Sequence, residues 1–293
     1  MSASRLSGTP MAPVPRAEAA RLGLRAVAML VVAGVAGVAA FAWPLFMRPE
    51  GLTSITGAPF VFALVLPLVL AVVVAELTSD ALDVKGLALL GVLAAVGAVL
   101  RPLGAGTAGL EPIFFLLILG GRVFGPGFGF AQGALTLAAS ALLTGGVGTW
   151  LPYQMIAAGL LGLGAGMLPG RPRGRAEIAL LGLYGLVSAF AYGWAMDFAF
   201  WPFAAGPQTE LSFDPSAGPL ENLHRFVLFN LVTSMGWNLG RGLTSLVLIA
   251  LLGPGLLHIL RRASRRAAWS ARPPRRGGRS RGRMVLSRAP GLR

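Results

Sequence analysis

The sequence predicts an all-α protein that crosses a membrane several times. Hydrophobic residues make up 55% of its 293 positions and charged residues only 12%, whereas a soluble domain usually carries about 25% charged residues. Apolar runs close to the ~20 residues that span a bilayer recur along the chain. Since such a chain would not stay soluble as a monomer, we expect a polytopic bundle of membrane helices.

Eight apolar segments are expected to form this bundle. In order they are Ala26–Phe46, Pro59–Ala75, Gly86–Leu100, Pro112–Gly120, Val123–Leu143, Pro152–Leu168, Ile178–Trp201 and Phe226–Leu252. The third would rise about 22 Å and the fourth about 13 Å, against a hydrocarbon core of ~30 Å. Either these two are broken or re-entrant pieces covered by neighbouring helices, or their boundaries lie several residues away.

Local signals support several of these boundaries. The first segment, Ala26–Phe46, is longer than the core of a signal peptide and lacks a small-residue cleavage pattern. The glycines around Pro126 predict a tight turn between the fourth and fifth segments. In the stretch GGVGTWLPYQM, the glycines make the next turn, Thr149 can cap the following helix, and Pro152 suits its first turn.

The distribution of charge predicts the orientation. The net charge is +14, and twelve of the 25 Lys and Arg residues follow Leu260. Basic ends of this kind indicate cytoplasmic termini and attraction to anionic lipid rather than binding to nucleic acid. We expect a basic tail at 1–25, a two-helix extension at 26–85, a membrane core at 86–260 and an Arg-rich disordered tail at 261–293. The excess of Arg over Lys, with abundant Ala and Gly, indicates a G+C-rich bacterial genome. We therefore expect the protein in a bacterial cell membrane.

Several classes of function are excluded by what the sequence lacks. It has no Cys, so disulfides, thiolate catalysis and Cys metal sites are excluded. It has no P-loop and therefore no nucleotide-hydrolysing site of its own. Its two histidines, His224 and His258, have no metal-ligand spacing. We therefore expect no enzyme activity, no cofactor and no metal.

Three loops are predicted to meet on the outer face, namely Arg101–Glu111, Gly145–Met155 and Pro202–Arg225. The first is rich in glycine and framed by a cation and a carboxylate. It is either a hinged loop whose Arg101 and Glu111 meet a polar solute, or a connector whose charges anchor at the lipid headgroups. In the second loop, Trp150, Tyr153 and Gln154 are expected at the mouth of a site, although either ring alone fits an interfacial belt.

Polar residues inside the apolar segments are further candidates. Gln132 is an amide within the fifth segment. In the seventh segment Trp194, Asp197 and Trp201 share one face near the outer end, where the carboxylate either serves a function or is merely solvated at the interface. In the last segment a polar stripe is expected, made of Asn230, Ser234, Asn238, Arg241 and Ser245.

The arginine of this stripe needs a protein or water environment because a charged side chain in the membrane is costly. Only Asp197 and Glu111 are obvious acidic residues to neutralise Arg241. We expect Arg241 to be held by Asp197, by Asn238 or by a ligand. A polar interior in the bundle follows from this expectation.

Several of these stretches together resemble a known family. The similarity covers roughly Gly86 to Arg262, and GTWLPYQM is its most specific piece. The other pieces are Arg101-Pro102, GGRVFGPGFGF, Gly133-Ala134-Leu135, Gly162–Gly166, Trp201-Pro202-Phe203, Trp237-Asn238-Leu239-Gly240-Arg241-Gly242 and Gly253-Pro254. The chain resembles the substrate-binding membrane subunits of energy-coupling factor vitamin transporters, in their cobalamin-type branch.

The resemblance implies a six-helix core that captures cobalamin or a related corrinoid at its outer side, with two extra helices before it. It implies three partners, a coupling membrane subunit and two cytoplasmic ATPase subunits. Docking in that family commonly uses a small-residue face on the first core helix, which Ala94 and Ala98 match. Alternatives are another ligand, such as riboflavin or a queuosine precursor, or a membrane protein that takes no part in transport.

Overall fold

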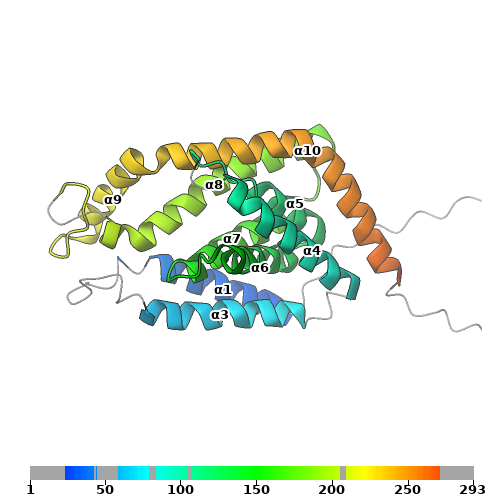
Figure 1. Cartoon of the computed structure of the whole chain (residues 1–293), viewed down its shortest axis with the longest axis horizontal. Helices are drawn as coiled ribbons and strands as arrows, with labels where there is room; N and C mark the ends of the chain where they lie inside the picture. Colours follow the sequence, from blue (N-terminus) through cyan, green and yellow to red (C-terminus); the bar gives the residue numbers. More distant parts are fainter. Residues whose placement is uncertain are drawn as a thin grey trace, which may run out of the picture.

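The computed structural model describes residues 24–42, 44, 59–78, 84–104, 107–204 and 209–270. All regular structure in these ranges is helical (Figure 1). Residues 1–23 of the predicted N-terminal tail and 271–293 of the predicted C-terminal tail lie outside the described residues, whereas 261–270 belong to a helix. The prediction of an all-α protein is confirmed.

The α-helices and one short 3₁₀ helix follow the predicted segments closely. They are α1 (Leu24–Phe41), α3 (Pro59–Leu77), α4 (Val84–Leu100), η2 (Arg101–Gly104), α5 (Phe114–Phe124), α6 (Pro126–Thr144), α7 (Leu151–Met167), α8 (Arg175–Ala204), α9 (Pro219–Thr233) and α10 (Met235–Ser270). Four stretches are long and apolar enough to cross a membrane, namely Val84–Gly104, Pro126–Thr144, Arg175–Ala204 and Met235–Arg265. The protein is therefore membrane-embedded. For the third segment the alternative of shifted boundaries is confirmed, because α4 and η2 together form a stretch of 21 residues. The fourth segment is short in the structure too, since α5 has 11 residues.

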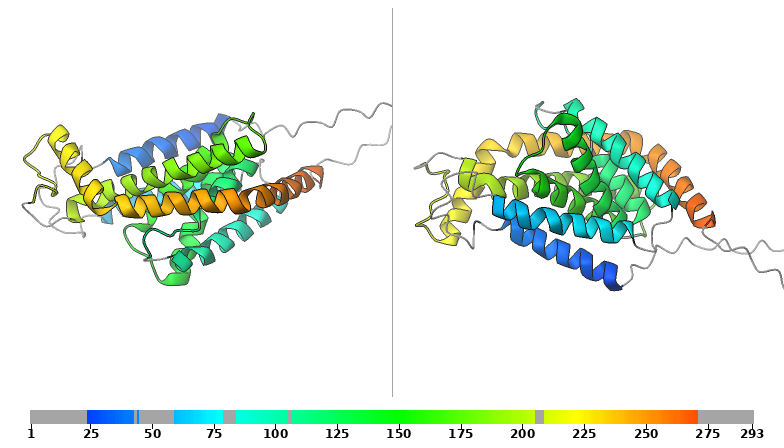
Figure 2. Two further views of the ribbon diagram at one scale, coloured as in Figure 1. Left: turned by 90° about the horizontal axis from the view of Figure 1, so that it is seen from above. Right: turned by 60° about the horizontal axis from the view of Figure 1, so that its bottom comes forward.

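The helices form a bundle with two directions. In Figure 1, α8 and α10 run across the picture, whereas α6 is seen close to end-on. Helices α1 and α3 pair with each other and pack against α6, α7 and α8. Helix α4 contacts mainly α6 and lies on another side of the bundle (Figure 2). The central group α5, α6 and α7 is therefore covered from several sides.

The last predicted segment, Phe226–Leu252, is two helices rather than one. The chain breaks at Ser234, whose φ of −117° ends α9 before α10 begins at Met235. Thr233 turns its hydroxyl back to the carbonyl of Phe229, at 2.7 Å. Side chains of this type compete with the helical hydrogen bonds and favour an interruption. The region after residue 86 consequently holds seven described α-helices instead of the expected six.

Glycines allow the central helices to touch through their backbones. A Cβ added at Gly129 of α6 would collide with the carbonyl of Gly162 on α7, and one at Gly162 would collide with the carbonyl of Gly129. Gly121 of α5 also faces the Gly162 carbonyl. Membrane helices associate through such close packing because lipid provides no hydrophobic drive between them.

This contact predicts a large effect of a small substitution. Gly129→Ala should lower the free energy of unfolding by about 1–3 kcal/mol, since α6 and α7 must move apart. Gly91→Ala on α4 is the matched control, because its new Cβ would meet nothing within 4 Å. Titration of the detergent-solubilised protein with a denaturing detergent measures both variants. Equal stability of the two would contradict the backbone contact.

Candidate binding site in the bundle interior

Arg241 of α10 is the centre of a buried polar assembly. Its side chain donates to Glu111 Oε1 at 2.7 Å and to Asn238 Oδ1 at 2.9 Å. The guanidinium also lies 5.1 Å from the ring centre of Tyr192 and 5.7 Å from that of Phe114, within cation–π range. Arg241 is only 8% exposed. The expectation that it faces the protein interior is confirmed.

Close backbone approaches bring the partners of Arg241 into place. Gly109 lies against the carbonyl of Trp237, and Gly240 lies against the carbonyl of Ala108. The loop before α5 therefore packs directly on α10 and carries Glu111 to the arginine. On α8, Gly193 leaves the space that Asn238 occupies, since a Cβ there would collide with the Asn238 amide.

Asp197 does not pair with Arg241. Its Oδ2 accepts a hydrogen bond of 2.6 Å from the amide of Asn230 on α9. Among the residues expected to hold Arg241, Asn238 is confirmed and Asp197 is wrong. The carboxylate that pairs with Arg241 is that of Glu111, which lies 130 residues away in the sequence. The polar stripe is therefore divided between two sets of partners.

Four buried polar atoms around these residues have no hydrogen-bond partner within the described part of the chain. Three of them are donors and one is an acceptor, namely Arg241 Nε, Asn238 Nδ2, Trp194 Nε1 and Asn230 Oδ1. They come from α8, α9 and α10. A buried polar group without a partner costs about 1–3 kcal/mol, so these atoms provide unused hydrogen-bonding capacity for a ligand.

A second polar group joins the loop after α4 to α6 and α7. Arg101 donates to Gln154 Oε1 at 3.0 Å and to the hydroxyl of Ser140 at 3.5 Å. Trp150 stands beside this group with 44% of its surface exposed, and its indole donates to the Gly146 carbonyl. In both views of Figure 2 the end of α4 and the turn between α6 and α7 lie side by side. The structure brings these two predicted loops together.

Three predicted site residues have structural partners instead. Tyr153 is buried between the rings of Phe41 and Phe200, at 5.4 and 5.2 Å, so it does not stand at a site mouth. Trp201 is buried and its indole donates to the Leu211 carbonyl at 2.6 Å. Gln132 is buried and donates to the Leu116 carbonyl at 3.3 Å, while its Oε1 has no hydrogen-bond partner among the described residues. These three side chains were expected in a substrate-binding site, but they are packed inside the bundle instead.

Ala94 and Ala98 are not available to a partner protein. Both are buried, on the face of α4 that packs mainly against α6. Gly97 on the same face touches the methyl group of Thr136. The prediction that these alanines form a docking surface is corrected, because the small residues serve helix packing within the chain.

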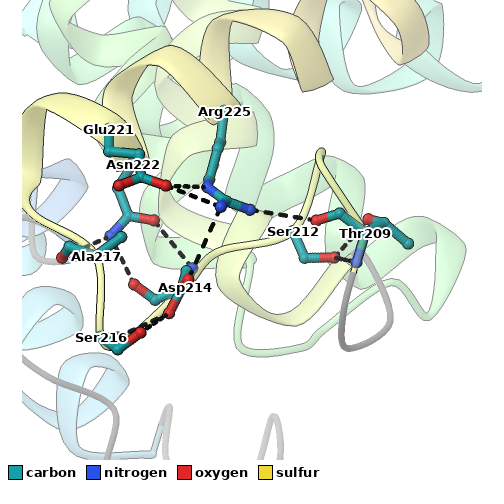
Figure 3. A network of polar contacts seen from close by, with 8 residues as sticks. All are labelled: Thr209, Ser212, Asp214, Ser216, Ala217, Glu221, Asn222 and Arg225. Carbon is teal, nitrogen blue, oxygen red and sulfur yellow. Dashed lines mark hydrogen bonds and ion pairs between the residues drawn. The ribbon is translucent and has the colours of Figure 1, made fainter.

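The third predicted outer loop lies apart from the other two. It joins α8 to α9 at the left end of Figure 1. Its centre is Asp214, whose Oδ1 accepts from the hydroxyl of Ser216 at 2.6 Å and from its backbone N–H at 2.8 Å (Figure 3). Asn222 donates to the Asp214 carbonyl at 2.8 Å, and Arg225 lies 3.8 Å from the carboxylate. The bonds from Ser216, with Arg225, hold the pKa of Asp214 below its ordinary value.

This network predicts a pH-dependent loop. Because the pKa of Asp214 is lower in the folded chain, its contribution is complete above the ordinary value of 3.8 and is lost as the pH falls through the lowered pKa. The backbone amide of Ser216, followed by NMR on selectively labelled protein, should titrate below pH 3.8. The transition should vanish in Asp214→Asn and persist in Glu210→Gln, an exposed carboxylate in the same loop. A midpoint above 3.8 would contradict the assignment.

One charged group escaped the sequence reasoning altogether. Glu177 near the start of α8 is 1% exposed and bonds Arg122 at 2.8 Å and Arg261 at 2.6 Å. Among the described residues, no three His, Cys, Asp or Glu side chains are grouped so that they could hold a metal ion.

Comparisons with known proteins add no identity to this geometry. No family model, no curated protein and no solved structure matches the chain. The class of protein that fold and site define is a membrane-embedded helical bundle with a charged interior.

Arg241 and Glu111 should be energetically coupled. Glu111→Gln leaves a buried cation without its carboxylate and should cost about 3 kcal/mol of stability. Arg241→Met should cost less, since Glu111 remains partly accessible to water. The double variant should be more stable than the sum of the two effects predicts. Asp197→Asn, combined with Arg241→Met, should show a much smaller coupling, because Asp197 bonds Asn230 and the ion pair of Arg241 is with Glu111.

Denaturant titration in detergent measures this cycle. Near-zero, additive effects for Glu111→Gln and Arg241→Met would show that the contact contributes nothing to the fold.

Proposed function

We propose that the chain is the substrate-capture subunit of a vitamin uptake system of the energy-coupling factor type, which binds cobalamin or a related corrinoid in a bacterial cell membrane. The observation that supports this proposal best is the assembly around Arg241, where buried donors and an acceptor lie unused inside a membrane bundle. An ionisable residue inside a membrane bundle is by default a candidate for a functional site. The sequence resemblance points to the same family.

The chemistry of the assembly suits an amphipathic ligand with several amide groups. A corrinoid carries amide side chains whose carbonyls can accept from Arg241, Asn238 and Trp194, and whose N–H groups can donate to Asn230. The rings of Phe114 and Tyr192 supply an apolar wall beside these groups. Ligand sites in general combine such walls with a few polar groups that fix orientation. In this proposal Arg101, Gln154 and Trp150 form a second contact at the turn beside α4.

Energy for uptake would come from partner subunits, since the chain has no P-loop. With Ala94 and Ala98 covered, docking on α4 would use its exposed face. That face presents Ala88, Gly91 and Ala95 at spacings of three and four residues. Small residues at these positions permit close approach of a second helix.

Ligand binding is the first test. Addition of about 0.1 mM cobalamin to the purified full chain should raise its thermal stability and change its tryptophan fluorescence. Asn238→Ala should weaken binding about tenfold, because a buried hydrogen bond is lost. Thr244→Ala on the same helix is the control, since that hydroxyl bonds only the backbone carbonyl of Gly240. An unchanged signal with cobalamin would overturn the corrinoid assignment, and riboflavin and a queuosine precursor tested in parallel show whether another heterocycle binds.

Uptake in proteoliposomes is the second test. Transport should require the coupling subunit, both ATPase subunits and ATP. Ala95→Trp should leave binding intact and abolish uptake. Ala39→Trp, at an exposed alanine of α1, should change neither. Uptake that is indifferent to the ATPase subunits would favour a membrane protein of another class.

A further inference from the structure

A groove lies where the start of α8 meets the second half of α10. Its volume is about 580 Å³, within the range of small-molecule sites, about 300–1,000 Å³. Pro254 lies inside α10, where a proline removes one backbone hydrogen bond and bends the helix. Figure 1 shows the bend, with the end of α10 turning away from its first half next to the beginning of α8.

One part of the groove is apolar and continues onto the surface of the bundle. This part is lined by Ile178, Ala250, Pro254 and Leu257. Gly253 lets α8 approach, since a Cβ there would lie 3.2 Å from the Ile178 side chain. Beside it on α10, Leu251 and Ile259 are 73% and 61% exposed. In a membrane these exposed side chains face hydrocarbon, so the groove is open to lipid chains.

The other part of the groove is basic. It is lined by Arg175, His258, Arg261 and Arg265, with Glu177 as the one acidic residue. Glu177 already bonds both Arg122 and Arg261, and a single carboxylate cannot neutralise two guanidinium groups. No ion pair reaches Arg175 or Arg265 from the described residues. The groove therefore keeps an excess of positive charge, to which the N-terminus of the 30-residue helix α8 adds its dipole.

We propose that this groove binds an anionic phospholipid. The phosphate lies between Arg175, Arg265 and His258, and an acyl chain follows the apolar wall formed by Ile178 and Leu257. Guanidinium groups bind phosphate oxygens through paired hydrogen bonds, and basic pockets between membrane helices are suited to acidic headgroups. The apolar wall and its continuation on α10 favour a lipid over a soluble phosphate, which would leave that wall in contact with water.

The proposal is independent of the vitamin ligand and of the ATPase partners. It concerns the end of the bundle that carries Arg122, Arg261 and the basic loop 171–175, whereas the Arg241 assembly involves the first turns of α10. A lipid in the groove would contact both α8 and α10 and hold the bend of α10 in place. Its effect should therefore be measurable on the chain alone.

Lipid titration of the full chain tests the proposal. The protein, purified in a neutral detergent, is titrated with phosphatidylglycerol or with phosphatidylcholine, and bound lipid is counted by native mass spectrometry while thermal stability is followed in parallel. We expect one phosphatidylglycerol retained at least about tenfold more tightly than phosphatidylcholine, from roughly additive contributions of the arginines. Arg175→Ala combined with Arg265→Ala should abolish this preference.

The control removes the same charge from nearby positions outside the groove. Arg171→Ala combined with Arg262→Ala changes two exposed arginines of the same loop and the same helix, and it should keep the preference. Equal retention of the two lipids by the unaltered chain would overturn the proposal, as would an equal loss of preference in both double variants. Full stabilisation by glycerol phosphate without acyl chains would also overturn it, in favour of a soluble anion.

Discussion

The charge of Arg241 inside an apolar bundle is the constraint on which the arrangement of α5, α8 and α10 depends. A charged arginine side chain within a membrane helix is costly unless protein groups or water surround it. The chain meets this cost with a carboxylate from Glu111, an amide from Asn238 and two aromatic faces. These partners come from the loop before α5, from α5 and α8, and from the preceding turn of α10 itself. The position of the guanidinium therefore fixes the loop before α5, the register of α8 and the first turns of α10 together.

Glycines make this arrangement possible without adding charge. At Gly109 and Gly240 the loop and α10 meet through their backbones, and at Gly193 the helix leaves room for an amide. The same device joins α6 to α7 through Gly129 and Gly162. The two sets of contacts differ in purpose. Those between α6 and α7 bring apolar helices together in lipid, whereas those around α10 bring polar groups together away from lipid.

Composition and apolar periods were sufficient to predict the helical membrane class and most helix positions, since these depend on local hydrophobicity. Arg241 was predictable as an interior residue because an unpaired charge cannot face lipid. Glu111 was one of two acidic candidates, beside Asp197. The choice between them depends on the path of the loop before α5, which the sequence does not reveal. The faces of α4 and α7 were not predictable, because helices apolar on all sides give no amphipathic signal. For this reason the sequence did not show that Ala94, Ala98 and Tyr153 are buried packing residues.

Insertions on the two sides of Ser234 should have different effects on the Arg241 assembly. One residue inserted within a helix turns everything beyond it by about 100°. An insertion in α10 before Arg241 would therefore rotate the guanidinium away from Glu111. An insertion in the loop before α9 lies outside both helices, so the loop can absorb it without any rotation of α10. Natural variation in length should accordingly accumulate on the α9 side of the break, while the spacing from Met235 to Arg241 stays constant.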